Sequence, residues 1–583
     1  MYAGSSDMGT SAMTQTLGTR GALQRPAWLR VLLLTAILLV AAALRIIALP
    51  AAPPGLHQDE AANAWNAWCL LKTGLDQTGK PWPIMYLHAF GENRSALYMY
   101  TLLPFQWLGG LNVWTTRLPA AVSGVLTVLL LYWIGARLFD RLTGLLAAAL
   151  LTLNPWHIQL VRFGHEASLC PLLACLAVAA LLWAGFPLGT REARPSVWKG
   201  LLAGLIVGGC CYGYPAIRLF LPVFLTVCGL VTWRAWWGQV RTRRGGPACV
   251  ALLVGLGLTF GPLAYYHLVH PDVIAKRADN VRAWNETDPV YIRLATVGAR
   301  YAAHFNPDLL FLHGQPVEMT SLRGFARLQL YTLPLLLCGL FVAVRDSVRS
   351  RSARVALCWL LLYPVGDCLH GHMYAADDGS WHVAVHPLRS APGLPGPVLL
   401  AAVGAAALGR QVWHRQRTLA WATFALFSVV ALTLDVRFLR YFFGEHSRHP
   451  TVYRDFQVAL LEAGTWLRPR LDQTDAVFVT RTEMNMPYVT LMVALECDPQ
   501  RWFRDARVVR AIEGWDFYDR VGKLYFLSTE AARAALEELK GNGHPDRAIF
   551  IVRPDEKQGL HDLLHTVNGP DGARALLVYD ATL

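Results

Sequence analysis

Residues 112–167 read NVWTTRLPAAVSGVLTVLLLYWIGARLFDRLTGLLAAALLTLNPWHIQLVRFGHEA. The stretch holds two apolar blocks, 115–137 and 142–158, each close to the ~20 residues that cross a bilayer as a helix. A short basic turn with Arg137 and Arg141 joins the two blocks, and polar residues follow the second. Apolar blocks of this length that are separated by basic turns are typical of a polytopic membrane protein.

The composition of the whole chain agrees with this interpretation. Of 583 residues, 54% are hydrophobic and 16% are charged, and the mean hydropathy is +0.32. Ordinary globular chains have about 25% charged residues. The net charge of +13 suggests nucleic acid at first, but the arginines cluster between apolar blocks, so we expect no nucleic-acid partner. Eight of the eleven cysteines fall within apolar blocks and none forms a CxxC pair, which argues against structural zinc.

Counting outward from residues 112–167 predicts eleven transmembrane helices. They are expected at 31–49, 115–137, 142–158, 167–185, 199–215, 217–236, 247–267, 327–345, 354–370, 388–408 and 418–436. Every second connection is rich in arginine, as around Arg243 and Arg349, and the positive-inside rule makes these connections cytoplasmic. The other connections then lie outside, including a long first loop at 50–114 and a large loop at 268–326.

Three segments complete the predicted organisation. Residues 1–30 are polar and lack a hydrophobic period, which predicts a disordered cytoplasmic leader before a transmembrane domain at 31–439. The first apolar run could also be a cleaved signal peptide, because Ala51 and Ala52 resemble a processing site. Residues 95–109 are apolar but short and contain Pro104, so we expect a helix in the membrane interface.

Residues 440–583 have a different character. Charged residues become frequent, and four strand-like runs at 475–480, 523–527, 547–552 and 574–579 alternate with helical patterns such as 529–540. This alternation predicts a small C-terminal α/β domain. An odd number of spans after a cytoplasmic start places that domain outside the cytoplasm.

The first outer loop opens with LHQDEAANAWNAW, residues 56–68, so Asp59 and Glu60 lie just beyond the first span. Adjacent carboxylates at a membrane surface can act as a general base or bind a divalent metal. They can equally begin a solvated helix, because acidic residues stabilise a helix N-terminus.

Several segments taken in order resemble one family. They are HQDEAANAWNAW (57–68), the stretch 112–167, YGYPAIRLFLPV (212–223), HFNPDLLFLHG (304–314) and HPLRSAPGLPGPVLLAAVG (386–404). Together they resemble the GT-C membrane glycosyltransferases, and protein O-mannosyltransferases and lipid A aminoarabinose transferases in particular. The resemblance implies inverting transfer of a sugar from a polyprenyl-phosphate carrier to a hydroxyl of a protein, lipid or glycan. It also implies a bacterial inner membrane, reaction on the outer face, Asp59 as the base and Glu60 as its positioning neighbour.

A leaving polyprenyl phosphate needs cations, and a guanidinium offers phosphate a planar pair of donors. The candidates in outer loops or at outer span ends are Arg94, Arg117, Arg162, Arg218 and Arg389. Each could instead snorkel toward lipid headgroups. Tyr98 and Tyr214, like Trp65, Trp68 and Tyr212, could contact the sugar or the isoprenoid, although aromatic residues also form interfacial belts.

Other questions stay open at this point. His57, His157 and His304 could ligate a metal, but no ligand spacing supports one, so a divalent metal is only a possible cofactor. A transporter or flippase is the rival function, since it too has many spans with polar residues. A membrane anchor for the C-terminal domain is a third interpretation, which the many charged residues at outer span ends disfavour. The sequence does not identify the sugar or the acceptor.

Overall fold

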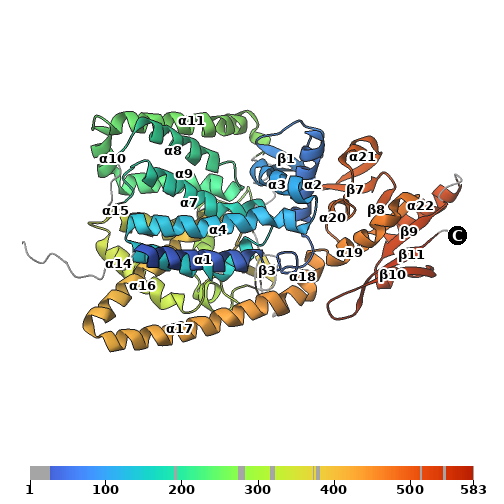
Figure 1. Cartoon of the computed structure of the whole chain (residues 1–583). Coiled ribbons are helices and arrows are strands. Elements are labelled where there is room, and N and C mark those ends of the chain that lie inside the picture. Colours follow the sequence, from blue (N-terminus) through green and yellow to red (C-terminus); the bar gives the residue numbers. More distant parts are fainter. Residues whose placement is uncertain are drawn as a thin grey trace, which may run out of the picture.

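Figure 1 shows a bundle of long helices with a sheet domain at its C-terminal end. The computed structural model describes residues 27–581 except 190–193, 274–281, 316–321, 323, 372, 376–380, 513–514 and 542–545. The predicted fold class, a polytopic helical membrane protein with a C-terminal α/β domain, is confirmed. The predicted leader at 1–30 falls almost wholly outside the described residues.

Six helical segments of the described chain are long and apolar enough to cross a membrane, and a seventh results if one bent pair counts as a single span. The bent pair is α9 (Pro215–Val231) and α10 (Trp233–Val240), which meet at 80°. The six are α1 (Ala27–Ile46), α4 (Val113–Leu138), Glu166–Trp183 (η1 and α7, Cys170–Trp183), α11 (Gly245–Val269), Ala391–Arg415 (η4 and α16, Pro395–Arg415) and Arg417–Arg448, which begins with α17 (Arg417–Arg440). The predicted number of eleven is not confirmed.

Four predicted spans are shorter than expected. The block 142–158 is two helices, α5 (Arg141–Thr152) and α6 (Pro155–Leu160), because Asn154 caps a new helix with Pro155 in its first turn. The other three are α8 (Val197–Cys210), α14 (Thr332–Asp346) and α15 (Arg351–Leu362). At 1.5 Å per residue these helices rise about 18–23 Å, less than the ~30 Å hydrocarbon core. The apolar blocks in the sequence extend beyond these helices because residues next to the helix ends are also apolar.

The first connecting segment is folded. α2 (Gln58–Thr73) begins with a capping box between His57 and Glu60 and ends at Gly74, whose φ of 72° is left-handed. A hairpin of β1 (Tyr86–Ala89) and β2 (Glu92–Ser95) leads into α3 (Ala96–Gly109). With 14 residues, α3 is too short to cross a membrane alone, as expected for the segment 95–109.

Short elements make up the later connections. They are α13 (Val290–Ala303), η2 (Asp308–Leu312), η3 (Tyr363–Gly366), the two-stranded sheet of β3 (Met373–Ala375) and β4 (Trp381–Val383), and η4 (Ala391–Gly393). Beyond α17 the chain passes through η5 (Tyr441–Glu445), η6 (His446–Arg448) and α18 (Pro450–Asp455) into the sheet domain.

The C-terminal domain is built on a seven-stranded mixed sheet in the order β10-β11-β9-β5-β8-β7-β6. Its centre is β5 (Ala476–Thr480), which is parallel to both β8 (Leu524–Leu527) and β9 (Ala548–Val552). All residues of β5 and β9 are buried, which explains their unbroken apolar sequences. All four predicted strands and the predicted helix are present. The remaining elements are β6 (Arg507–Ile512), β7 (Trp515–Val521), β10 (Asp562–Asn568), β11 (Arg574–Asp580), α19 (Val458–Leu467), α20 (Pro487–Ala494), α21 (Pro499–Arg504) and α22 (Thr529–Gly541).

This domain is docked on the first connecting segment through a shared apolar core. Trp65 of α2 meets Trp502 of α21 edge to face at 5.6 Å, and Trp502 Nε1 donates to the carbonyl of Gln77 at 2.8 Å. On the other side, the backbone N–H of Asp516 in β7 donates to the carbonyl of Phe90 at 3.2 Å. The docking therefore fixes β7 beside the β1–β2 hairpin.

Candidate functional site

A cavity of about 530 Å³ lies between the helical bundle and the C-terminal domain. Its walls come from the start of α2, from β2, from the segments before α7, α9 and α16, and from two parts of the C-terminal domain. Its lining residues are His57, Gln58, Asp59, Phe90, Glu92, Arg94, Ser95, His165, Glu166, Tyr214, Pro215, His386, Leu388, Arg389, Asn485, Met486, Trp515 and Phe517. Four of the nine predicted site residues line the cavity, namely Asp59, Arg94, Tyr214 and Arg389, and the other five do not.

Asp59 is the most exposed carboxylate of a charged cluster in this cavity. Arg94 Nη1 donates to Asp59 Oδ1 at 2.8 Å, while Arg94 Nε and Nη2 donate to the two oxygens of Glu166 at 2.8 and 3.1 Å. The Asp59 side chain is 22% exposed, against 9% for Arg94 and 3% for Glu166. Burial alone would raise the pKa of Asp59, but the charge of Arg94, with smaller contributions from His57 and His165, lowers it well below its ordinary value. Asp59 is thus ionised at neutral pH.

Arg94 is held as a cation by the same contacts. Burial alone would lower its pKa, but Glu166 and Asp59 raise the pKa of Arg94 above its ordinary value. Three of its nitrogens already donate to two carboxylates, so the role of Arg94 here is to hold Asp59 and Glu166 in position.

Two buried histidines flank Asp59, and their hydrogen bonds fix their tautomers. Burial lowers the pKa of His57 and of His165, so both rings are neutral at pH 7. Nδ1 of His57 accepts from the Asp59 N–H at 3.2 Å, and Nδ1 of His165 accepts from the Ala167 N–H at 3.0 Å. In a neutral ring whose Nδ1 accepts, Nε2 carries the proton. Neither Nε2 can then take another proton, whereas Asp59 Oδ2, which Arg94 does not contact, is a proton acceptor at the cavity.

Glu60 is separated from the cavity although it follows Asp59. It is fully buried and binds the fully buried Arg117, with Nε to Oε1 and Nη2 to Oε2 both at 2.7 Å. Gly164 donates its N–H to Glu60 Oε1 at 2.6 Å, and a side chain there would lie 2.8 Å from a backbone oxygen. The remaining Arg117 donors bind the carbonyls of Leu49, Pro53 and Gly55. Neither residue lines the cavity: Glu60, expected to position Asp59, and Arg117, expected to bind phosphate, are paired with each other.

Arg162 and Tyr98 also lie outside the cavity. Arg162 is fully buried and donates to the carbonyls of Leu44, Ile47, Ala48 and Ala52. It thus supplies hydrogen-bond donors to backbone carbonyls at and just beyond the C-terminal end of α1. Tyr98 is fully buried and donates its O–H to the Thr116 carbonyl at 2.8 Å. Arg162 was expected to bind phosphate and Tyr98 to contact the donor, but neither residue is among those that line the cavity.

Arg218 does not line the cavity but contacts a residue that does. Its Nη2 donates to the hydroxyl of Ser95, which lines the cavity, at 2.6 Å, and its Nη1 donates to the Tyr86 hydroxyl. Tyr214 lines the cavity directly and meets His165 edge to face at 5.3 Å.

Arg389 faces the cavity without a side-chain partner among the described residues. It is 7% exposed, and its Nη1 is buried with no hydrogen-bond partner among the described residues. No ion pair or side-chain hydrogen bond of Arg389 occurs in the described part of the chain. A buried, unsatisfied guanidinium is costly, so its position in a cavity wall indicates an anionic ligand.

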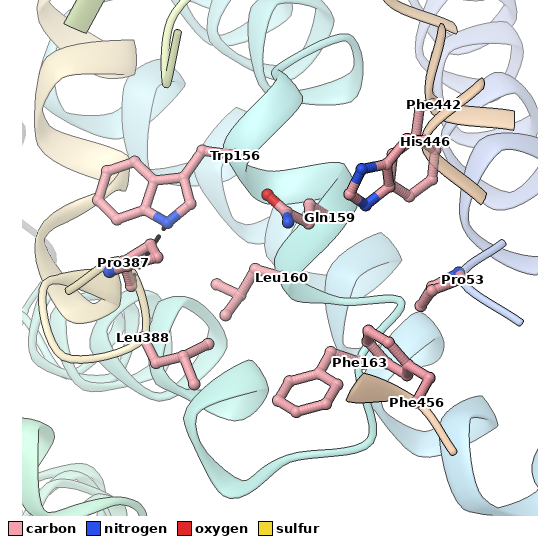
Figure 2. A pocket seen from close by; sticks show the side chains of 10 residues that line it. All are labelled: Pro53, Trp156, Gln159, Leu160, Phe163, Pro387, Leu388, Phe442, His446 and Phe456. Atoms are coloured by element: carbon pink, nitrogen blue, oxygen red, sulfur yellow. Dashed lines mark hydrogen bonds between the residues drawn. The ribbon is translucent and has the colours of Figure 1, made fainter. Parts of the chain in front are cut away.

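A narrow hollow adjoins the cavity at Leu388 (Figure 2). It offers about 10 Å³, room for one water molecule. Figure 2 shows Gln159 between Trp156 and His446, and Trp156 Nε1 donates to the Pro387 carbonyl at 3.2 Å. Nε2 of Gln159 is buried without a partner among the described residues.

The sequence did not identify several cavity residues. His165 and Glu166 lie in the quoted RFGHEA motif, where a second acidic residue beside a histidine was the available signal. Asn485, Met486, Trp515 and Phe517 belong to the C-terminal domain, and no motif connects them to the first loop. No group of three or more His, Cys, Asp and Glu side chains suited to a metal occurs within the described ranges.

Residues 94–259 match the family model described as dolichyl-phosphate-mannose-protein mannosyltransferase. A 133-residue stretch is 29% identical to the undecaprenyl phosphate-alpha-4-amino-4-deoxy-L-arabinose arabinosyl transferase of Erwinia tasmaniensis. That match spans 22% of this chain and 23% of the relative.

The fold extends the likeness over nearly the whole chain. The crystal structure of ArnT from Cupriavidus metallidurans in the apo state covers 94% of this chain and 97% of its own, at 15% identity and a TM-score of 0.50. The same protein bound to undecaprenyl phosphate gives 15% identity and a TM-score of 0.48 over 95% of this chain and 98% of its own. The matched family model and the fold shared with ArnT agree with the resemblance that the motifs indicated, which is to the GT-C membrane glycosyltransferases.

Proposed function

We propose that this protein transfers a sugar from a polyprenyl-phosphate carrier to an acceptor hydroxyl in the cavity beside Asp59. One observation carries the proposal: a single cavity contains an open carboxylate oxygen at Asp59 and a guanidinium at Arg389 whose buried Nη1 has no partner among the described residues. Sugar transfer from a phosphate carrier needs these two groups, a proton acceptor for the nucleophile and a cation for the leaving phosphate. The relatives' printed names, which include an undecaprenyl phosphate-dependent transferase, support the same class of donor.

In this mechanism Asp59 Oδ2 accepts a hydrogen bond from the acceptor hydroxyl. As the acceptor oxygen bonds to the anomeric carbon, its proton passes to Oδ2 and the bond between that carbon and the phosphate oxygen breaks. The electron pair leaves with the polyprenyl phosphate, whose charge Arg389 balances. A single displacement inverts the anomeric centre.

The low pKa of Asp59 is compatible with this role. A carboxylate held ionised by Arg94 is a weak base, but the attacking hydroxyl becomes strongly acidic as its bond to carbon forms. Arg94 binds only Oδ1, and the nearest histidine nitrogens lie 3.6 and 3.8 Å from Oδ2, which leaves that oxygen free for the acceptor.

The outer face of the membrane and a bacterial inner membrane are part of the proposal. They rest on the arginine-rich connections predicted to be cytoplasmic, which place the cavity and residues 440–583 on the opposite side.

The test is sugar transfer by purified protein in liposomes, with a panel of polyprenyl-phosphate-linked sugars and envelope extracts as acceptors. We expect Asp59→Asn to lower turnover by roughly 10²–10⁴-fold, the usual contribution of a general base, with little change in carrier binding. Gln58→Ala, at a neighbouring cavity residue, is the control for local disturbance. A folded Asp59→Asn protein with wild-type turnover would refute the assignment, and movement of the carrier across the bilayer without transfer would favour the transporter alternative.

A further inference from the structure

The outer surface of α17 carries a second site that the transfer chemistry does not use. Only two of its 24 residues, Asp435 and Phe438, are buried, and both lie in its last two turns. The rest of this helix presents exposed apolar side chains such as Phe424, Val429 and Leu432. Figure 1 shows α17 along one edge of the bundle. A helix of this kind faces lipid over most of its length.

A lateral groove of about 760 Å³ runs beside the last turns of α17. Its wall changes character along the helix: Leu432 and Val436 are apolar, and Arg437 and Arg440 follow toward the end. Residues 433, 437 and 440 are spaced by four and three positions, so they share one face of the helix. The groove is therefore amphipathic along its axis, apolar toward the middle of the span and cationic at its end.

The two arginines are available for a ligand. Both are exposed, and neither makes an ion pair or side-chain hydrogen bond to another residue of the described chain. Arg437 lies over the ring of Phe325 with 5.5 Å to its centre, which fixes it at the groove. The groove also contains one carboxylate, that of Glu445, so its balance is one positive charge.

The position of these charges matches a lipid headgroup. From Arg417 at the start of α17 to Arg437 is about 30 Å along the axis, the thickness of the hydrocarbon core. The arginine pair thus lies at headgroup depth on the membrane face where η5 and η6 lead to the C-terminal domain. Arginine suits phosphate because it presents a fork of donors.

We propose that this groove binds a membrane lipid with an anionic phosphate headgroup, its phosphate between Arg437 and Arg440 and its chains along Leu432 and Val436. Phe325 lines both this groove and a neighbouring hollow. Trp156 and Gln159 line that hollow and also the narrow hollow of Figure 2, which meets the cavity at Leu388. The lipid thus lies at the far end of a row of adjoining hollows. Binding at the groove does not depend on the proposed function.

The test counts bound lipids on the purified full-length protein by native mass spectrometry. The probes are phosphatidylglycerol, zwitterionic phosphatidylcholine and inorganic phosphate. We expect phosphatidylglycerol to be retained in preference to phosphatidylcholine, and Arg437→Gln with Arg440→Gln to weaken its binding at least about tenfold, the loss of one charge-assisted bond. Inorganic phosphate should not displace it.

Matched controls separate this site from general charge effects. Arg415→Gln with Arg417→Gln removes the same charge at the opposite end of the span and should leave the preference intact. Arg437→Lys with Arg440→Lys keeps the charge and should restore part of the binding, which distinguishes a lost site from a misfolded protein. Unchanged retention in the glutamine pair, an equal loss in the control pair, or displacement by inorganic phosphate would each overturn the proposal.

Discussion

Arg117 and Glu60 form a two-point ion pair in which both partners have no solvent exposure, with both N–O distances at 2.7 Å. The pair ties the start of α4 to the start of α2, one residue from Asp59. Because the other Arg117 donors bind carbonyls of the chain between α1 and α2, the pair sets the backbone path into the cavity.

The first prediction concerns that pair. Arg117→Ala leaves the Glu60 carboxylate buried without its cation, so we expect a loss of roughly 3–5 kcal/mol in the free energy of unfolding. Arg117→Lys should rescue little, because an ammonium cannot make the five bonds of the guanidinium. Thermal melting in detergent is the measurement. A stable Arg117→Ala protein that loses only carrier affinity would restore Arg117 to the phosphate site.

The second prediction is the reverse for Arg389. Because its side chain has no partner in the described chain, Arg389→Ala should keep the wild-type melting temperature. Its affinity for polyprenyl phosphate should fall about 10- to 100-fold, the loss of a charge-assisted bond. Arg389→Lys should recover part of it. Equal binding by the alanine variant and the wild type would remove Arg389 from the carrier site.

The third prediction concerns pH. The folded protein holds the pKa of Asp59 below its ordinary value of 3.8, so the ionised form is complete above that value and is lost only as the pH falls through the lower folded pKa. The profile of kcat/KM should therefore show no acid limb from Asp59 above about pH 4.

Removing Arg94 should change this profile. In Arg94→Gln the effect of burial prevails, the pKa of Asp59 rises, and the acid limb moves to higher pH. Arg510→Gln removes a cation that pairs with Asp519 in the C-terminal domain, and it should leave the profile unchanged. A profile of Arg94→Gln that matches the wild type would contradict Asp59 as the titrating base.

The fourth prediction assigns the acceptor side of the cavity to the C-terminal domain. Trp515 and Phe517 are two residues apart on β7, so they share a face, and both line the cavity. Aromatic rings bind the apolar faces of sugars and lipids. Trp515→Ala should raise the KM for the acceptor more than it lowers kcat at saturating donor. Leu563→Ala, an exposed apolar residue of β10 at the far side of the sheet, is the control, and the same KM shift in both would argue against contact.

The sequence predicted what depends on local pattern. The strands β5, β8, β9 and β11 follow from continuous apolar runs, and Asp59 follows from its place after the first span. The sequence could not show which charges would pair across the chain. Arg117 and Arg389 both stand at the start of an apolar block in the sequence. In the structure Arg117 forms an ion pair with Glu60, 57 positions away, whereas Arg389 faces a cavity. Likewise, the lengths of several predicted spans were wrong because the helices end inside apolar sequence, and hydropathy does not show where a helix ends.

The docking of the C-terminal domain has a consequence for biosynthesis. The cavity takes one wall from residues 57–59 and another from Asn485, Met486, Trp515 and Phe517, so the wall is missing until ribosomes have made most of the chain. Domains fold in order of synthesis, N-terminal parts first. The apolar helices are therefore made before the cavity is closed, and a nascent or truncated chain can occupy the membrane without the complete cavity that we propose as the transfer site.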